Sequence, residues 1–331
     1  MIKKLKWGIL STAKIAREKV IPALQKSSMC EVYAIASRSA EKAKATAAAL
    51  QIEKHYDSYE ALLNDNEIDV IYIPLPNHLH VEWLIKSLQA GKHVLCEKPI
   101  GINQDDATKL LQEAQKHPKL KMMEAFMYRF HPQWKKVKEL VESGIIGDVK
   151  SIQTNFSYYN VDPDNIRNKP EVFGGALMDI GCYYISFPRF VLGIEPKRVM
   201  GIMDFDPAMK TDRLTSGILD FTNGISSTFT CSTQLMPYQR VQILGNEGRI
   251  EIEIPVNAPL DVASHVWLKT KNEQKEFIIN PVDQYTLQGD YFSASILNDT
   301  VTEPSLEDSV NNMKVIDAIV LSFKENRWVN P

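Results

Sequence analysis

Two short segments of this chain combine residue types that can perform acid–base chemistry on a substrate oxygen. The first is Glu97-Lys98-Pro99, which follows the apolar run His93–Cys96. Proline lacks a backbone donor and restricts the residue before it, so we expect a strand to end here. Lys98 then stands at the carboxyl end of a strand, where open α/β sheets bind ligands, and its ammonium can polarise an oxygen. The alternative for this tripeptide alone is a surface lysine before a turn.

The second segment is Gly174–Tyr183, which begins with two glycines. If a helix starts at Met178, Asp179 and Tyr183 are four residues apart and share one face. A carboxylate beside a phenol is a plausible pair of catalytic groups. The alternative is a packed helix in which one of Tyr183 and Tyr184 is a core residue.

The first ~120 residues alternate apolar runs with helical patterns, which is typical of βαβ units and a parallel sheet. Ala40–Leu50, Asn77–Gln89 and Asn103–His117 are the clearest helices. The expected strands are Leu5–Leu10, Val32–Ala36, Val70–Ile73, His93–Cys96 and Lys121–Ala125.

Beyond Pro132 the pattern changes to a helix (Pro132–Ser143), a long strand (Val149–Tyr158) and a helix around Met178–Leu192. Consecutive strands without crossover helices then predict a mostly antiparallel sheet. Two helices, Tyr285–Leu297 and Leu306–Lys324, end the chain. The 331 residues exceed one ordinary core, so we expect two domains, 1–122 and 123–331. The expected sheet strands are Arg198–Met203, Ser216–Phe221, Ile225–Cys231, Arg240–Leu244, Arg249–Ile254, Val266–Lys269 and Phe277–Ile279.

The turn after the first strand reads Ser11-Thr12-Ala13-Lys14-Ile15-Ala16, in the place where dinucleotide folds carry three glycines. Small residues there still allow a pyrophosphate to approach the backbone, provided that their φ angles stay negative. The Ser11 and Thr12 hydroxyls are further phosphate donors. A plain strand–helix turn is the alternative.

The end of the second strand, Ser37-Arg38-Ser39, has no carboxylate to bind ribose hydroxyls. Arginine binds phosphate through a planar fork, so Arg38 favours NADP over NAD; a solvated Arg38 is the alternative. Downstream, the loop Leu75–His80 lies at the carboxyl edge of the sheet, where its backbone can line the cofactor. The residues that we expect to contact the cofactor are Ser11, Thr12, Ala13, Lys14, Ile15, Ser37, Arg38, Leu75, Asn77, His80, Glu97 and Lys98.

Composition bounds the class of protein and its partners. A net charge of −3 without a basic block gives no reason to expect nucleic acid. No apolar stretch reaches membrane-spanning length. The four cysteines are widely spaced and form no metal-type pair, as expected of reduced thiols in a cytoplasmic protein.

Taken in order, these segments resemble the glucose–fructose oxidoreductase/inositol dehydrogenase (Gfo/Idh/MocA) family over essentially the whole chain. The motifs that carry the resemblance are the turn near residue 11, Ser37-Arg38, Pro76-Asn77-x-x-His80, Glu97-Lys98-Pro99, Glu124–Arg129 and Gly174–Tyr183. Many members have histidine where Tyr183 stands. Tyrosine there is similar to the branch of dihydrodiol dehydrogenase, NADP-linked xylose dehydrogenase and glucose–fructose oxidoreductase. The missing turn glycines depart from the family pattern and bear on cofactor affinity.

The resemblance implies a Rossmann domain followed by an α+β domain whose large open sheet forms a homodimer. It also implies a hydride transfer to or from a sugar, polyol or trans-dihydrodiol, with NADP(H) as cofactor and no metal. In this interpretation Tyr183 is the acid/base, Lys98 its electrostatic partner and Asp179 an orienting group; the first two roles can be reversed. Substrate contacts are expected from Lys98, Arg129, Asp179 and Tyr183, and specificity from the loop Asn160–Phe173.

A further expectation from the resemblance is that the Lys98–Pro99 peptide bond is cis. Two other functions remain open from the sequence: an NAD-dependent glycosidase that oxidises its substrate transiently, and a non-catalytic regulator that responds to NADP.

Overall fold

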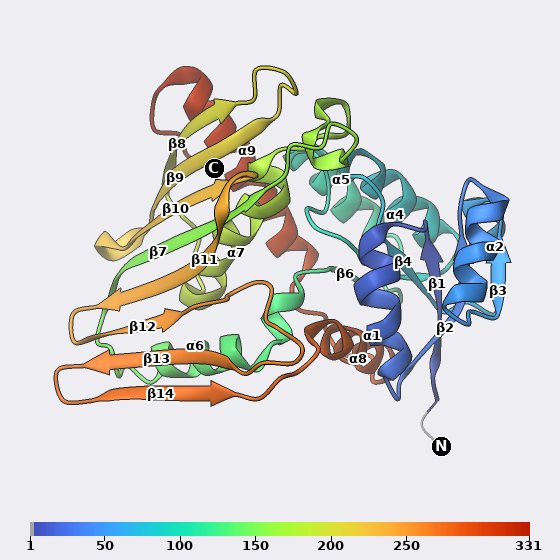
Figure 1. Ribbon diagram of the computed structural model, residues 1–331, viewed down its shortest axis with the longest axis horizontal. Helices are drawn as coiled ribbons and strands as arrows, with labels where there is room; N and C mark the ends of the chain where they lie inside the picture. The colour runs from blue at the N-terminus through green and yellow to red at the C-terminus, as the bar shows by residue number, and fades with distance from the viewer. Residues whose placement is uncertain (1–2) are drawn as a thin grey trace. The chain divides into compact units, whose positions relative to one another are not determined.

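The computed structural model describes residues 3–331 and divides them into two compact units, each drawn in Figure 1. The first unit comprises residues 3–127 and 283–310, and the second comprises 128–282 and 311–331. The sequence suggested a single boundary at residue 122. The two divisions differ mainly because a helix late in the sequence, within residues 283–310, packs on the first unit.

A sheet of six parallel strands forms the centre of the first unit, in the order β3-β2-β1-β4-β5-β6. This is the strand order of a Rossmann dinucleotide-binding fold, so the predicted fold class is confirmed. The predicted strands are all present, whereas β3 was missed because its three residues contain no apolar run. The strands are β1 (Leu5–Leu10), β2 (Cys30–Ala36), β3 (Lys54–Tyr56), β4 (Val70–Ile73), β5 (His93–Cys96) and β6 (Met122–Glu124).

Helices connect these strands, and side-chain caps define where several of them begin. Ser39 accepts from the Lys42 N–H at the start of α2, and Asn103 accepts from the Asp106 N–H at the start of α5. Each cap satisfies one of the N–H groups that a helix leaves without a partner. The helical segments are η1 (Ala16–Val20), α1 (Ile21–Lys26), α2 (Ala40–Ala49), α3 (Tyr59–Leu63), η2 (Asn77–Leu79), α4 (His80–Gln89) and α5 (Gln104–Ala114).

Helix α8 (Gln284–Leu297) joins the first unit although 155 residues of the second unit precede it (128–282). It lies beside α1 in Figure 1, and the Thr286 hydroxyl donates to the Ala23 carbonyl at 2.9 Å. The buried Phe292 ring meets Trp7 of β1 edge-on, with ring centroids 5.9 Å apart. Sequence patterns show that α8 is amphipathic but not which sheet it covers.

The second unit is built on an eight-stranded sheet in the order β14-β13-β12-β11-β7-β10-β9-β8. Only the β7–β10 pair is parallel, so the predicted mostly antiparallel sheet is confirmed. The Asn223-Gly224 turn between β9 and β10 has positive φ at both residues, as tight hairpins require. The strands are β7 (Val149–Tyr159), β8 (Arg198–Phe205), β9 (Asp212–Asp220), β10 (Ser226–Ser232), β11 (Gln234–Gly245), β12 (Gly248–Ile252), β13 (Ser264–Thr270) and β14 (Gln274–Ile279).

Helices of the second unit lie on one face of this sheet (Figure 1). Gly201 of β8 packs so closely on α9 that a Cβ there would lie 2.7 Å from Ile319. Within the described residues the opposite face of the sheet carries no helix. The helical segments are η3 (Met127–Phe130), α6 (Pro132–Glu142), η4 (Ile166–Asn168), η5 (Pro170–Val172), η6 (Leu177–Gly181), α7 (Cys182–Leu192), η7 (Thr222–Gly224) and α9 (Leu306–Glu325), whose first residues belong to the first unit.

None of the helices in the described part of the chain is both long and apolar enough to cross a membrane.

Candidate active site

The turn after β1 has one backbone feature of a glycine-rich turn, a positive φ, although it contains no glycine. Ser11 has φ of 99°, which glycine adopts far more easily than an L-residue. The expectation that φ stays negative in this turn is therefore wrong for Ser11. A helix follows directly, and the Arg17 N–H bonds to the Ala13 carbonyl at 3.1 Å. The first N–H groups of such a helix have no partner within it and can bind a pyrophosphate.

At the end of β2, Ser37 and Arg38 are placed differently. Ser37 is buried, and its hydroxyl accepts from the Ser39 N–H at 3.2 Å. Arg38 is exposed, and within residues 3–331 its guanidinium makes no hydrogen bond or ion pair. An unpaired guanidinium next to the dinucleotide turn fits a ribose 2′-phosphate. The two segments together therefore fit an NADP molecule.

The loop that carries Lys98 is fixed by polar contacts on both of its flanks. The Tyr72 hydroxyl donates to Glu97 Oε1 at 2.6 Å, and the Ile100 N–H donates to Glu124 Oε1 at 2.9 Å. The Lys98–Pro99 peptide bond is cis, as predicted. These contacts hold the backbone around Lys98 at the carboxyl end of β5, where the sequence placed it.

His80 connects the loop after β4 to the Lys98 segment. Its Nδ1 lies 2.8 Å from the Pro99 carbonyl oxygen, and its Nε2 lies 2.7 Å from the Leu75 carbonyl oxygen. Burial lowers the pKa of His80, while the two carbonyl groups oppose that shift. These contacts give His80 a bracing role. Cofactor contacts from Leu75, Asn77 and His80 stay predictions.

In the second unit, Asp179 and Tyr183 lie on a continuous helical run formed by η6 and α7. The Tyr158 hydroxyl donates to Asp179 Oδ2 at 2.6 Å, and Arg167 Nε forms an ion pair with the same oxygen at 2.8 Å. The charge of Asp179 raises the pKa of Arg167. Burial and the Asp179 charge raise the pKa of Tyr158, which therefore stays a neutral donor. The Arg167 guanidinium and the Tyr158 phenol thus both hold Asp179.

Tyr183 is 4% exposed and packs edge-on against Tyr128, with ring centroids 6.0 Å apart. The neighbouring Tyr184 is fully buried, and its hydroxyl donates to the Asn155 carbonyl at 2.6 Å. The Tyr184 hydroxyl is thus bonded to the main chain of β7. This bears out the expectation that one of the pair is a core residue.

Arg129 lies against α7 in the second unit. Its Nη2 donates to the Ser186 hydroxyl at 2.8 Å, and the Tyr128 hydroxyl shares that partner at 2.7 Å. The guanidinium also lies 5.1 Å from the centre of the Phe190 ring. These contacts anchor the chain after β6 to α7. Contact of Arg129 with a substrate stays a prediction.

The helix that carries Asp179 and Tyr183 begins at a tightly packed pair of glycines. The Gly175 N–H donates to the Arg167 carbonyl at 2.7 Å, and a Cβ on Gly174 would lie 2.5 Å from that carbonyl oxygen. Gly175 has φ of 118°, and a Cβ there would lie 1.9 Å from Asp212 Oδ1. Both positions therefore require glycine.

Asp212 fixes the start of this helix from β9. Its Oδ2 accepts from the Leu177 N–H at 2.8 Å and from the Thr215 hydroxyl at 2.7 Å. Burial raises the pKa of Asp212 to about 6, although these donors oppose the shift. A carboxylate without a cation in a buried place favours its protonated form.

Sequence reasoning missed Arg167, Tyr158 and Asp212. Arg167 stands in a loop rich in Asp, Asn and Pro, and was included only within the specificity loop Asn160–Phe173. The Gly174-Gly175 pair was the available signal, because two adjacent glycines indicate a close backbone approach. No pattern in the sequence shows which segment makes that approach.

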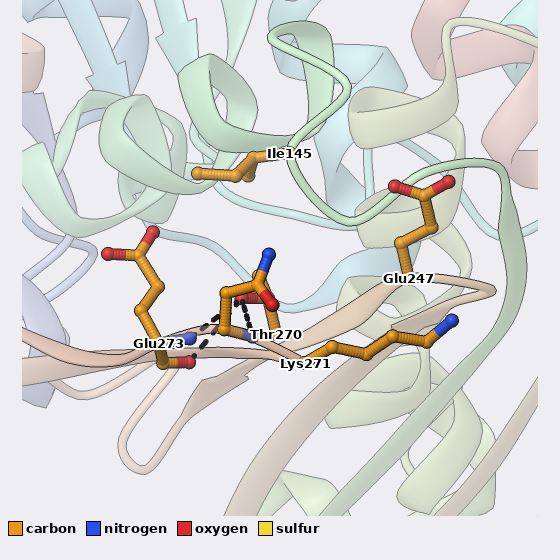
Figure 2. Close-up of a pocket in the computed structure, with 6 residues that line it drawn as sticks. Ile145, Glu247, Thr270, Lys271 and Glu273 are labelled. Atoms are coloured by element: carbon orange, nitrogen blue, oxygen red, sulfur yellow. Dashed lines mark hydrogen bonds between the residues drawn. The ribbon is translucent and has the colours of Figure 1, made fainter.

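Other concave surface in the second unit does not coincide with these residues. An open hollow of about 570 Å³ is lined by residues of the β13–β14 turn and by Ile145 and Glu247. Figure 2 shows these residues. Apart from Ile145, the side chains that line the hollow are polar, and none of the lining residues is buried. Among the described residues no group of three or more His, Cys, Asp or Glu side chains is arranged to hold a metal ion.

Comparison with known proteins extends over almost the whole chain. Residues 5–125 match an oxidoreductase family with an NAD-binding Rossmann fold (GFO/IDH/MocA), and residues 134–251 match the GFO/IDH/MocA C-terminal domain. An uncharacterized oxidoreductase of Rhizobium meliloti is 40% identical over 329 residues, which is 98% of each chain. The NADP(+) D-xylose 1-dehydrogenase 2 of Haloferax volcanii is 36% identical over 314 residues, 95% of each chain.

Among solved structures, KijD10, a 3-ketoreductase from Actinomadura kijaniata in complex with NADP and TDP-benzene, superposes with a TM-score of 0.91. It is 28% identical, and the match covers 97% of this chain and 98% of that one. The same two-unit architecture therefore binds NADP in a relative of known structure.

The buried Asp212 predicts a pH dependence of stability. Its folded-state pKa of about 6 exceeds the unfolded value of 3.8, so its favourable contribution is complete below pH ~4 and is lost as pH rises through ~6. The expected loss is about 3 kcal/mol at ~1.4 kcal/mol per pKa unit. The free energy of unfolding of the wild type, minus that of Asp212→Asn, should decrease over this range in urea titrations. Exposed Asp261→Asn is the control, and a pH-independent difference for Asp212→Asn would refute the assignment.

Proposed function

Because the chain belongs to the GFO/IDH/MocA oxidoreductase family, we propose that it is an NADP(H)-dependent dehydrogenase or reductase of a hydroxyl or carbonyl carbon in a sugar or related diol. The observation that carries the proposal is the combination of a glycine-shaped turn at Ser11, an unpaired Arg38 and an anchored Lys98 segment. The similarity to a xylose dehydrogenase and a 3-ketoreductase supports it. Neither of these relatives is named as a glycosidase or a regulator, which favours the oxidoreductase over those alternatives.

Residues of the first unit bind the cofactor in this proposal. N–H groups at the start of the helix after Ser11 bind the pyrophosphate, and Arg38 binds the ribose 2′-phosphate. NADP, when bound, supplies the hydride acceptor or, when reduced, the hydride donor. The protein must therefore move only a proton and stabilise charge on the substrate oxygen.

Tyr183 and Lys98 perform these two tasks in the proposed mechanism. As the substrate hydroxyl is oxidised, the Tyr183 phenolate accepts its proton, and in the reverse direction the phenol donates it. The Lys98 ammonium donates to the same oxygen and stabilises the phenolate. Asp179, held by Arg167 and Tyr158, orients the substrate beside Tyr183.

Substitution of the proposed catalytic pair tests this mechanism. Tyr183→Phe and Lys98→Met are each expected to lower kcat by about 10²- to 10⁴-fold while NADPH still binds. Turnover is followed by nicotinamide absorbance with a panel of aldoses and diols, and NADPH binding by fluorescence titration. Tyr184→Phe is the matched control, because it removes the hydroxyl of the adjacent, fully buried tyrosine. Turnover like that of the wild type in either catalytic variant would show that another group moves the proton.

The cofactor preference is tested at Arg38. Loss of a charge-assisted bond to phosphate in Arg38→Gln is expected to weaken NADPH binding by about 10- to 100-fold. NADH lacks the 2′-phosphate, so its affinity should not change. Lys44→Gln removes an exposed cation from α2 of the same unit and should leave both affinities unchanged. Equal weakening of NADPH and NADH by Arg38→Gln would contradict the role in phosphate binding.

We further propose that two chains associate through the uncovered face of the second unit's sheet. Gly201 and Gly217 are paired on the face that carries the helices, so the side chain of Ile218 points to the opposite face. Ile202 is likewise exposed, as are Tyr238 and Met236 on β11. An uncovered sheet face with several exposed apolar side chains supports a partner of the same chain. The four buried free cysteines support a location in the cytoplasm.

Light scattering tests the dimer. Ile218→Glu places a charge on the proposed interface and is expected to convert the dimer to a monomer. Leu321→Glu on α9 is the control, since Leu321 and Ile218 are each 39% exposed and lie on different faces. A monomeric wild type, or a dimer that survives Ile218→Glu together with Ile202→Glu, would overturn the proposed interface.

A further inference from the structure

Arg167 has a guanidinium of which only one edge is used by the protein. Its Nε pairs with Asp179 Oδ2 at 2.8 Å, and the side chain is 42% exposed. In the part of the chain that the structure describes, neither terminal nitrogen of Arg167 makes a hydrogen bond. A guanidinium presents five N–H donors in a planar fork, so the outer edge of Arg167 remains available to a ligand.

The loop backbone that presents Arg167 is held firmly. Its N–H donates to Asn165 Oδ1 at 3.1 Å, and its carbonyl accepts from the Gly175 N–H at 2.7 Å. Asn168 is buried, and its amide donates to the Asp162 carbonyl at 2.8 Å, closing the loop on itself. Arg167 is therefore attached at both ends of its side chain, by its backbone and by Asp179.

Arg167 lies near the proposed acid/base as well, because its partner Asp179 stands about one helical turn before Tyr183. The charges of Asp179, Tyr158 and Tyr183 each raise the pKa of Arg167, with Asp179 contributing most. Asp179 and Tyr183 are four residues apart on one helical run, so they share a face. A substrate whose reacting oxygen meets Tyr183 would present its neighbouring groups to Arg167.

The charge around Arg167 indicates what kind of group it binds. Asp179 neutralises the guanidinium. The loop Asn160–Phe173 contributes Lys169 and three further carboxylates, which are Asp162, Asp164 and Glu171. The net negative charge of this loop together with Asp179 opposes a phosphate or carboxylate ligand, whereas a neutral hydroxyl oxygen can accept from the guanidinium without a charge penalty.

We propose that Arg167 is a substrate-binding residue whose terminal nitrogens donate to a ring hydroxyl next to the reacting carbon, and that the substrate is a neutral sugar. This inference rests on the proposed function. It extends that function by excluding sugar acids and nucleotide sugars as preferred substrates.

Kinetics with paired substrates test the inference. The wild type is assayed with NADP(H) on D-xylose and D-glucose, on D-glucuronate, on a nucleoside diphosphate glucose and on the mono-deoxy analogues of the best neutral sugar. Arg167→Gln and Arg167→Lys are then compared with the wild type. Lys150→Gln is the matched control, because Lys150 is an exposed cation of β7, outside the loop, and pairs with Asp148, not Asp179. Circular dichroism and NADPH titration verify that each variant is folded and binds the cofactor.

The expected result is a decrease in kcat/KM of about 10- to 100-fold in Arg167→Gln for neutral sugars. With the wild type, kcat/KM for one deoxy analogue should be lower than for the parent sugar by a similar factor. With Arg167→Gln, kcat/KM for that analogue should not fall below the value for the parent sugar, since both changes remove the same contact. Lys150→Gln should behave like the wild type.

Two outcomes would overturn the inference while leaving the proposed function in place. One is a wild type that prefers glucuronate or the nucleotide sugar. The other is an additive loss in Arg167→Gln for every deoxy analogue, because a merely structural role lowers activity without regard to any one hydroxyl. No turnover of any substrate by the wild type would refute the proposed function, and this inference with it.

Discussion

The close backbone approach at Gly174 and Gly175 is the constraint on which the second unit's part of the site depends. A side chain at either position would collide with the Arg167 carbonyl or with Asp212. Without that approach the Arg167 carbonyl loses its bond from the Gly175 N–H, and the helix loses the carboxylate that accepts from the Leu177 N–H. Two residues without side chains thus determine where a guanidinium, a carboxylate and a phenol lie.

The first unit solves a similar problem with polar contacts instead of glycines. Lys98 follows β5, which lies between β4 and β6 in the sheet. Tyr72 of β4 bonds to Glu97, and Glu124 of β6 bonds to the Ile100 N–H. His80 bonds to the carbonyl of Pro99. Buried polar groups are costly unless they are bonded, so such a network has one favourable arrangement. It therefore fixes the lysine's backbone more closely than apolar packing alone would.

The sequence was most informative where local chemistry determines structure. Apolar runs located β1, β4 and β5 to the residue, and Pro99 together with the preceding lysine located the end of β5. It was least informative where a contact joins distant segments. Arg167, in the loop before η6, forms an ion pair with Asp179, and Phe292 of α8 packs against Trp7 of β1. Neither contact has a period or spacing that a sequence pattern can reveal, because each depends on how the chain folds back.

The backbone conformation of Ser11 also could not be predicted from the sequence, because it depends on a contact with another segment. The residue type suggested a turn with negative φ, yet its φ is 99°. An L-residue in that region costs about 1–3 kcal/mol, so the surrounding structure must impose the conformation. The Ser11 N–H bonds to the Ala36 carbonyl at 2.9 Å, which continues the β1–β2 pairing into the turn. The parallel sheet therefore sets the shape of the turn, and glycine is favourable there without being required. This explains how a chain that lacks the glycine fingerprint holds a positive φ at the start of the turn, where the fingerprint would have its first glycine.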